Sequence, residues 1–142
     1  MANTKPIGVA YEDQYIIGAN VVQAENIATT GTIGYAAGSF GTVTQTNNKT
    51  TGVTLNTPSG QITTANAQMA PNANAVFVVT CSACSLKDVV VISVASGGTL
   101  GAYNAFIAAV GNGSFTVELK NVTNNAYSEA IKLNYAIFHT ET

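Results

Sequence analysis

Short runs of β-type residues recur about every ten to twelve residues from Gly41 onward, and turn-forming residues separate them. No run shows an apolar 3.6-residue period long enough to predict a helix of more than two turns. Short strands at this regular spacing are typical of a two-layered all-β domain, because each strand crosses the core once before the chain turns back. The eight expected strands are 41–45, 52–56, 60–64, 75–80, 88–94, 103–110, 114–121 and 130–140.

The last two runs alternate most clearly between apolar and polar residues. Since successive side chains of a strand point to opposite faces, all the apolar residues of such a run lie on one face. We therefore predict an antiparallel β-sandwich, jelly-roll-like, with about eight strands. The core residues expected from these two runs are Phe115, Val117, Leu119, Ile131, Leu133, Tyr135 and Ile137.

Two local segments carry specific structural expectations. Gly111-Asn112-Gly113 lies between two β runs and predicts a tight hairpin, because glycine and asparagine tolerate the positive φ that such turns need. Thr64–Met69 is the best helix candidate, but it is long enough for only a turn of helix before Pro71 ends it.

The first forty residues differ from the rest. Residues 1–23 mix short apolar groups with glycine and polar residues, and residues 28–41 are rich in glycine and small residues. Such a composition favours an extended arm followed by a flexible or tightly turning connection. We place a boundary near Gly41, with an arm and glycine-rich connection at 1–40 and an oligomerising β-sandwich at 41–142.

The composition limits the classes of partner. Only 8 % of the residues are charged while 46 % are hydrophobic, so the surface is polar but nearly uncharged and is expected to be covered in part by copies of the chain or by a larger assembly. The net charge is -2 and no arginine is present, which argues against nucleic-acid binding. No apolar stretch is long enough for a membrane span, and we expect a soluble protein made in a cytoplasm.

Cys81 and Cys84 form a single CxxC between two β runs. A structural zinc site needs four ligands, and His139, the one histidine of the chain, would leave the set one short. We interpret the cysteines as small residues of a loop between strands, while a disulfide or an adventitious metal stays open. For His139, a partly exposed position at a strand end is favoured over an ion site on an oligomer axis.

No catalytic set is expected, and the chain is not predicted to be an enzyme or to need a cofactor. A Ser-His-Asp arrangement would have to combine His139 with Asp13 or Asp88. Paired carboxylates for glycoside hydrolysis would have to come from Asp88, Glu118 or Glu129, which we interpret as solvated surface charges. Tyr103 and Tyr127 are candidates for a carbohydrate platform, although packing at an edge of the sandwich is the favoured interpretation.

The segment 41–139 resembles a β-domain of tailed-phage virion proteins. The matching stretches are GTVTQTNNKTTGVTLN, GQIT, AVFVVT, DVVVISVASGG, GSFTVELKNVT and SEAIKLNYAIF, and they cover about seventy per cent of the chain. The leader KPIGVAYEDQ is similar to the short leader of head-decoration members, whereas the cysteine pair departs from the expected pattern. The resemblance implies a location on the virion, commonly as a trimer, and supplies no catalytic residue.

From the resemblance and the composition we expect a structural protein that decorates the capsid surface as a cement protein. Its expected partners are other copies of the chain, as a homotrimer, and the major capsid protein. The alternative is a head-fibre or tail-fibre tip that recognises a host surface glycan, and a small β-sandwich enzyme or lectin unrelated to phage is a third reading. The capsid-attachment residues expected in the arm are Pro6, Ile7, Val9, Tyr11, Tyr15, Ile16 and Ile17.

Overall fold

The computed structural model describes residues 30–140, and in that range it contains ten β-strands and no helix. The chain divides into two units, residues 1–33 and 34–142, and all ten strands belong to the second unit. The strands are β1 (Phe40–Thr44), β2 (Val53–Thr54), β3 (Ser59–Thr63), β4 (Gln68–Met69), β5 (Asn74–Thr80), β6 (Val89–Ser96), β7 (Tyr103–Gly111), β8 (Ser114–Asn121), β9 (Tyr127–Ser128) and β10 (Lys132–Phe138). The all-β prediction is thus confirmed.

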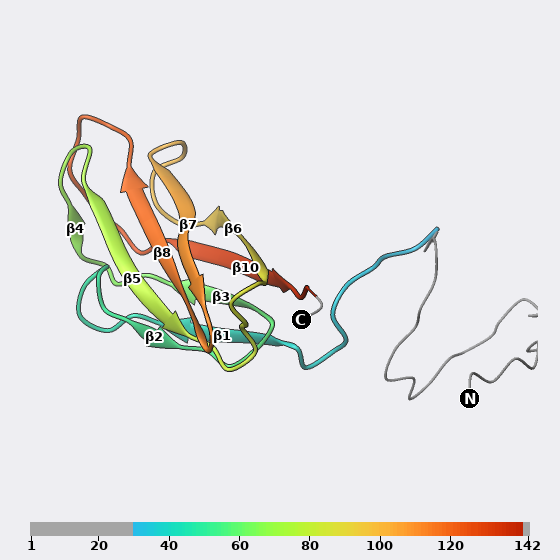
Figure 1. The fold of residues 1–142 in the computed structure, drawn as a ribbon. Coiled ribbons are helices and arrows are strands. Elements are labelled where there is room, and N and C mark those ends of the chain that lie inside the picture. The colour runs from blue at the N-terminus through green and yellow to red at the C-terminus, as the bar shows by residue number, and fades with distance from the viewer. Residues whose placement is uncertain (1–29, 141–142) are drawn as a thin grey trace, which may run out of the picture. The chain divides into compact units, whose positions relative to one another are not determined.

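The strands form two four-stranded sheets and one short ribbon (Figure 1). The first sheet has the order β1-β3-β10-β6, the second has the order β2-β5-β8-β7, and β4 pairs with β9. One buried cluster takes its side chains from both sheets, so the two sheets share a single hydrophobic core.

The prediction of a purely antiparallel arrangement is wrong at one edge of each sheet. β1 pairs with β3 in parallel, and β2 pairs with β5 in parallel. The reason lies in the connections. The chain leaves β1 for β2 in the other sheet before it returns to β3, so β1 and β3 are not joined by a hairpin and can run in the same direction.

The alternation that predicted the core is confirmed in β8 and β10. The inward residues of β8 are at most 1 % exposed, and Tyr135 of β10 is 3 % exposed with its ring centroid 5.0 Å from that of Phe115. Full burial of an apolar side chain of this size contributes about 1.5–3 kcal/mol. The inward residues of these two strands therefore hold the sheets together.

The predicted hairpin joins β7 to β8. Gly111 pairs with Ser114, and Gly113 has a φ of +76°. The same turn also holds the neighbouring cysteine segment, because Cys81 N–H donates to the Gly113 carbonyl at 2.9 Å and Gly113 N–H donates to the Cys84 carbonyl at 2.8 Å. The hairpin tip is therefore part of a larger hydrogen-bonded loop cluster.

The predicted turn of helix at Thr64–Met69 is wrong, since Gln68–Met69 forms β4 and the residues before it are irregular. The backbone groups of this segment bond to distant partners. Thr64 N–H donates to the Ile131 carbonyl at 2.8 Å, and Ala65 N–H donates to Gln45 Oε1 at 3.2 Å. These groups are consequently not available for helical hydrogen bonds.

Lys49 is buried, which is unusual for a lysine side chain. Its Nζ donates to the Ala65 carbonyl at 2.6 Å and also to the Glu129 carbonyl. Burial lowers the pKa of the Lys49 ammonium, and the charge of Glu129 offsets part of that effect. Lys49 thus joins the loop after β1 to two segments that are distant in the sequence.

Candidate functional site

An apolar patch lies on the outward face of the first sheet. It consists of Phe40, Val89, Val91, Ala136 and Phe138, which lie in two neighbouring rows across the sheet. In one row Ala136 pairs with Val91, and Ser59 stands between Ala136 and Phe40. In the next row Phe138 pairs with Val89. Of these, Phe138 is 61 % exposed and Phe40 is 56 % exposed. Parts of the patch line a shallow hollow of about 370 Å³.

The next row of side chains on this face is polar and uncharged. Thr42, Gln61, Asn134 and Ser93 follow one another across β1, β3, β10 and β6. Gln61 Nε2 donates to Asn134 Oδ1 at 2.8 Å. Uncharged amide and hydroxyl groups need little desolvation compared with ions, so the face is suited to contact with another protein surface.

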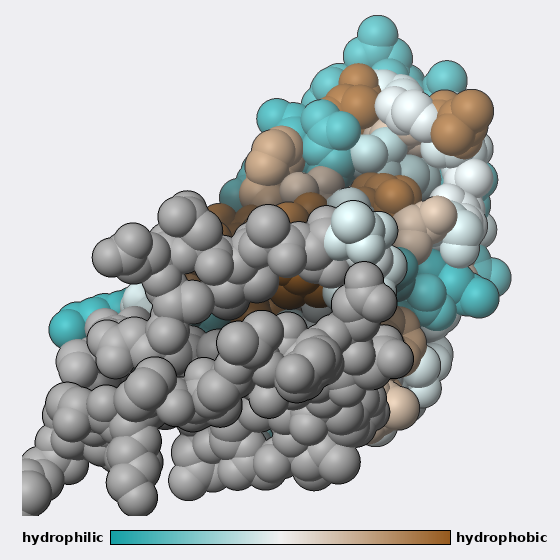
Figure 2. All heavy atoms as spheres, turned by 90° about the vertical axis from the view of Figure 1, so that its right-hand side faces the viewer, coloured by the Kyte–Doolittle hydropathy of each residue, from teal (hydrophilic) through white to brown (hydrophobic). Residues whose placement is uncertain are grey.

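The outward face of the second sheet is mixed in character. Val76 and Phe106 flank Glu118 across β5, β8 and β7, and the two apolar side chains are 47 % and 48 % exposed. In the view of Figure 2, hydrophobic residues (brown) are exposed next to hydrophilic residues (teal). Exposed apolar groups are therefore found on both sheets.

Asp88 and His139 are hydrogen-bonded to each other where β6 begins and β10 ends. Asp88 Oδ2 lies 2.9 Å from His139 Nδ1 and accepts the Ser85 N–H at 2.8 Å, while Oδ1 accepts the Thr140 N–H at 3.3 Å. The Asp88 side chain is 1 % exposed and that of His139 is 50 % exposed. Burial raises the pKa of Asp88, but the hydrogen bonds from Ser85, His139 and Thr140 outweigh it, and the pKa is lowered overall.

This pair corrects the interpretation of Asp88 as a solvated surface charge. A Ser-His-Asp set needs a serine hydroxyl bonded to the imidazole. In residues 30–140, no serine hydroxyl bonds to His139, whose bonded side-chain partner is Asp88. The arrangement links the end of β10 to the start of β6.

Cys81 and Cys84 are both buried and carry free thiols. They lie in one turn, because Cys84 N–H donates to the Cys81 carbonyl at 3.0 Å, and Cys81 Sγ lies 3.4 Å from the Thr57 carbonyl oxygen. Burial raises the pKa of the Cys84 thiol, and the charges of Asp88 and Cys81 add to that effect. Both residues thus occupy the loop between strands that the sequence predicted.

Metal ligation was left open for these cysteines. Within the part of the chain that the structure describes, no three or more histidine, cysteine, aspartate or glutamate side chains are grouped so as to hold a metal ion.

Glu129 anchors the loop between β6 and β7. Its carboxylate accepts the Thr99 N–H at 2.8 Å, the Thr99 hydroxyl at 2.7 Å and the Tyr103 hydroxyl at 2.9 Å. These hydrogen bonds lower the pKa of Glu129, while burial first and Glu129 second raise the pKa of Tyr103. Glu129 is therefore partly exposed, as expected for a surface charge, but it is hydrogen-bonded to Thr99 and Tyr103.

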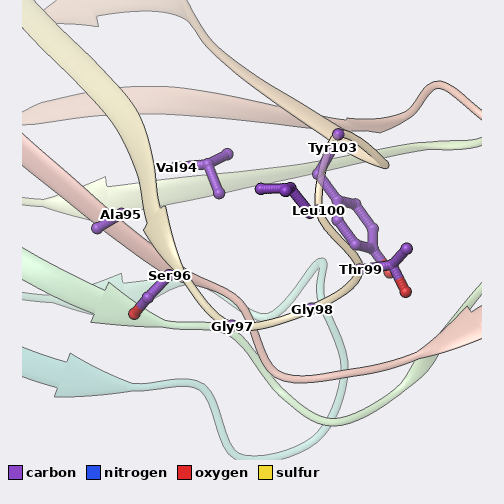
Figure 3. A pocket seen from close by; sticks show the side chains of 9 residues that line it. Val94, Ala95, Ser96, Gly97, Gly98, Thr99, Leu100 and Tyr103 are labelled. Carbon is purple, nitrogen blue, oxygen red and sulfur yellow. The ribbon is translucent and has the colours of Figure 1, made fainter.

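The same loop lines a small hollow of about 170 Å³ (Figure 3). Leu100 is fully exposed, and Figure 3 shows its side chain beside those of Val94 and Tyr103. Tyr103 is buried, and its ring centroid lies 6.2 Å from that of Tyr127 at a tilted angle. Tyr103 is accordingly packed at the edge of the fold rather than presented as a flat platform for a sugar.

The predicted capsid-attachment residues, from Pro6 to Ile17, lie outside the described residues, as does Asp13. Comparison of the chain with family models, with curated proteins and with solved structures found no match. Among residues 30–140 no helix has the length and apolar character needed to cross a membrane.

Sequence reasoning missed the pairing of Asp88 with His139 and the anchoring role of Glu129. A usable signal existed for the first: Asp88 begins the expected run 88–94, and His139 lies near the end of the expected run 130–140. Antiparallel neighbours bring the start of one strand next to the end of the other, but which strands are neighbours is not evident from a single sequence.

Proposed function

We propose that this chain is a structural protein of a tailed-bacteriophage virion that decorates and stabilises the capsid surface, without enzymatic activity. The observation that carries the proposal is the apolar patch on the first sheet, beside a polar row that has no charge. Contact between an apolar patch and water is unfavourable. Burial of the patch against another protein surface removes this contact.

The distribution of charge supports the same function. Residues 30–140 contain seven charged residues, Lys49, Lys87, Asp88, Glu118, Lys120, Glu129 and Lys132. Two of them, Lys49 and Asp88, are buried. The surface of this unit consequently carries few ions that would have to be desolvated when it packs into an assembly.

We further propose that the domain is a jelly-roll-like β-sandwich and that it forms trimers. The strand order supports the first part: β3, β5, β6 and β7 alternate between the two sheets, and β10 and β8 then enter the middle of the first and second sheet. The trimer rests on the resemblance of residues 41–139 to virion β-domains.

The N-terminal arm is the proposed attachment to the major capsid protein. Ile7, Val9, Ile16 and Ile17 are apolar groups in a segment with few charges, and such a segment can add a strand to a capsid subunit or fill an apolar groove on it. The proposed location is the capsid surface, after synthesis in the host cytoplasm.

The test is binding to purified heads that lack this protein. A variant with aspartate at Ile7, Val9, Ile16 and Ile17 should fail to bind, while a control with aspartate at Asn3, Gln14, Asn20 and Gln23 carries the same added charge and should bind. Deleting residues 3–23 should likewise abolish binding and leave the oligomer folded. Full occupancy of the heads by the deletion variant would refute the proposal.

The same arm variants also distinguish capsid decoration from the alternative function, a fibre tip that binds a host glycan. A protein that recognises a host glycan should bind an array of bacterial surface glycans and whole host cells, and its arm variants should retain that binding. Binding to cells without binding to heads would favour the fibre tip.

A further inference from the structure

β6 and β7 are the two outer strands on one side of the fold, and each has a single hydrogen-bonded neighbour among residues 30–140. β6 pairs with β10 and ends the first sheet, while β7 pairs with β8 and ends the second sheet. The two strands are consecutive in the chain and contact each other. We define this side, Val89–Ser96 together with Tyr103–Gly111, as the β6–β7 edge.

No charged residue occurs on this edge. From Val89 through Val117 the sequence runs for 29 residues without aspartate, glutamate, lysine, arginine or histidine, and it contains no proline there either. Soluble proteins usually protect such edge strands with charges, proline or very short strands, because open edges pair with other chains. β6 and β7 are long, at 8 and 9 residues, and lack charges and proline.

The core is also incompletely closed along this edge. Val94 belongs to the inward face of β6, since it pairs with the buried Leu133, yet it is 38 % exposed. Ile92, Ala105 and Ile107 pack against the core but are only partly buried. By contrast, the inward residues of the central strands β8 and β10 are at most 3 % exposed.

The opposite side of the fold differs. There the outer strands are β1, of 5 residues, and β2, of only 2 residues. A strand of 2 residues offers very few open backbone groups to a partner. Within the described residues, only the β6–β7 edge therefore combines two features. Its edge strands are long and have unpaired backbone groups, and its inward apolar side chains are only partly buried.

We propose that the β6–β7 edge is the surface through which copies of this chain associate, with β6 of one copy against β7 of the next. This inference rests on the proposed function as a self-assembling virion protein and names the surface that does the assembling. Open backbone groups on a strand edge accept another extended strand best, because it satisfies them in a regular ladder.

Two arguments favour a second copy over an unrelated partner. Identical surfaces bring identical charges together, and an edge without charge meets its own copy without repulsion. The strands also match in length. Pairing β6 with β6 about a two-fold axis would leave both β7 edges open, whereas β6 against β7 around a closed ring covers the β6 and β7 edges of every copy and agrees with the proposed trimer.

The experiment compares lysine variants of the full chain in two matched pairs. Ser93→Lys on β6 has Thr42→Lys on β1 as its control, since both residues are exposed and stand at opposite ends of one row across the first sheet. Phe106→Lys on β7 has Val76→Lys on β5 as its control, since both flank Glu118 and are equally exposed. Circular dichroism and thermal unfolding check that each variant is folded.

Sedimentation velocity then gives the mass in solution. We expect Ser93→Lys and Phe106→Lys to shift the protein from the oligomer to the mass of one chain at concentrations where Thr42→Lys and Val76→Lys remain oligomeric. Hydrogen exchange supplies a second measurement: peptides covering 89–96 and 103–111 should lose protection when the parent oligomer is diluted or when either edge variant is made.

The outcomes separate the two proposals. If the edge variants are folded and keep the mass and the exchange protection of the parent, the β6–β7 edge is not the interface, while the decoration function can still hold through head binding. If the parent is a single chain at every concentration, the edge proposal is overturned directly. If the parent is oligomeric but fails to bind heads, the decoration function is refuted. The edge proposal is then decided by the mass of the edge variants alone.

Discussion

Asp88 Oδ2 and His139 Nδ1 lie 2.9 Å apart, although 51 residues separate them in the sequence. The pair joins two neighbouring strands at one end of the first sheet, because Asp88 directly precedes β6 and His139 directly follows β10. Thr140 adds to this closure, with its hydroxyl donating to the Lys87 carbonyl at 2.8 Å. The C-terminal end of the described chain is therefore fastened by side chains as well as by the strand ladder.

The buried Asp88 carboxylate should make the protein sensitive to acid. Its folded-state pKa is lowered from the ordinary value of 3.8, so its contribution to stability is fully present above that value and is lost as the pH falls through the folded pKa. In Asp88→Asn, stability should be lower at neutral pH and should depend less on pH in the acid range. Denaturant unfolding at a series of pH values measures this, with Glu118→Gln as the control that should retain the acid dependence of the parent.

The buried Lys49 should be important for stability rather than for binding. Lys49→Met keeps most of the side-chain volume but leaves the carbonyls of Ala65 and Glu129 without their donor. We expect a loss of about 1–3 kcal/mol in the free energy of unfolding, since buried acceptors would be left unsatisfied. Lys87→Met, at an exposed position, should change the free energy by less than about 0.5 kcal/mol. Equal effects of the two substitutions in urea unfolding would contradict the assigned role.

Two glycines should respond to alanine for different reasons. At Gly113 a Cβ would meet nothing within 4 Å, but the φ of +76° is unfavourable for alanine, so Gly113→Ala should cost about 1 kcal/mol. At Gly60 a Cβ would lie 2.7 Å from Leu55 Cδ2 and 2.8 Å from the Gly41 carbonyl oxygen. Because that carbonyl belongs to the neighbouring strand β1, Gly60→Ala should cost more, about 1–3 kcal/mol or above.

Gly101→Ala serves as the reference for these two variants, since Gly101 has a φ of +75° and the same open surroundings as Gly113. Thermal unfolding of all three should rank Gly60→Ala as the least stable and the other two as similar. A Gly60→Ala protein as stable as the parent would mean that β1 does not lie against β3 as described.

The thiols of the CxxC turn should be slow to react in the folded protein. Burial raises the pKa of Cys84, so little thiolate is present at neutral pH, and the thiolate is the reactive form. An aromatic disulfide reagent followed by absorbance should modify the native protein slowly and the denatured protein rapidly, with the native rate increasing as the pH is raised. Rapid native modification of a Cys81→Ser variant, in which Cys84 is the remaining thiol, would show that the turn is open.

The fold was predictable where one residue pattern decided the outcome. The alternation of Phe115, Val117 and Leu119 determines which face of β8 is buried, whatever strands lie beside it. The hairpin at Gly111–Gly113 was predictable for a similar reason, because the turn and the two strands are contiguous in the chain.

Features that depend on neighbours distant in the sequence were not predictable in this way. The parallel pairing of β1 with β3, the ribbon of β4 with β9 and the burial of Lys49 all require the three-dimensional path of the chain. The same holds for Asp88 and Glu129, whose partners lie 51 and 30 residues away. A charge in a loop gives no sign by itself of the donors that surround it.

The parallel pairing of β1 with β3 has a mechanical consequence. β1 is the first strand of its sheet and pairs with β3 at five consecutive positions, from Phe40 to Thr44. A tension that pulls the preceding chain along the direction of β1 loads all these pairs in shear at the same moment, whereas a pull across the strand would peel them apart one after another. A domain tethered through this strand should thus resist a steady axial load better than its modest number of hydrogen bonds suggests.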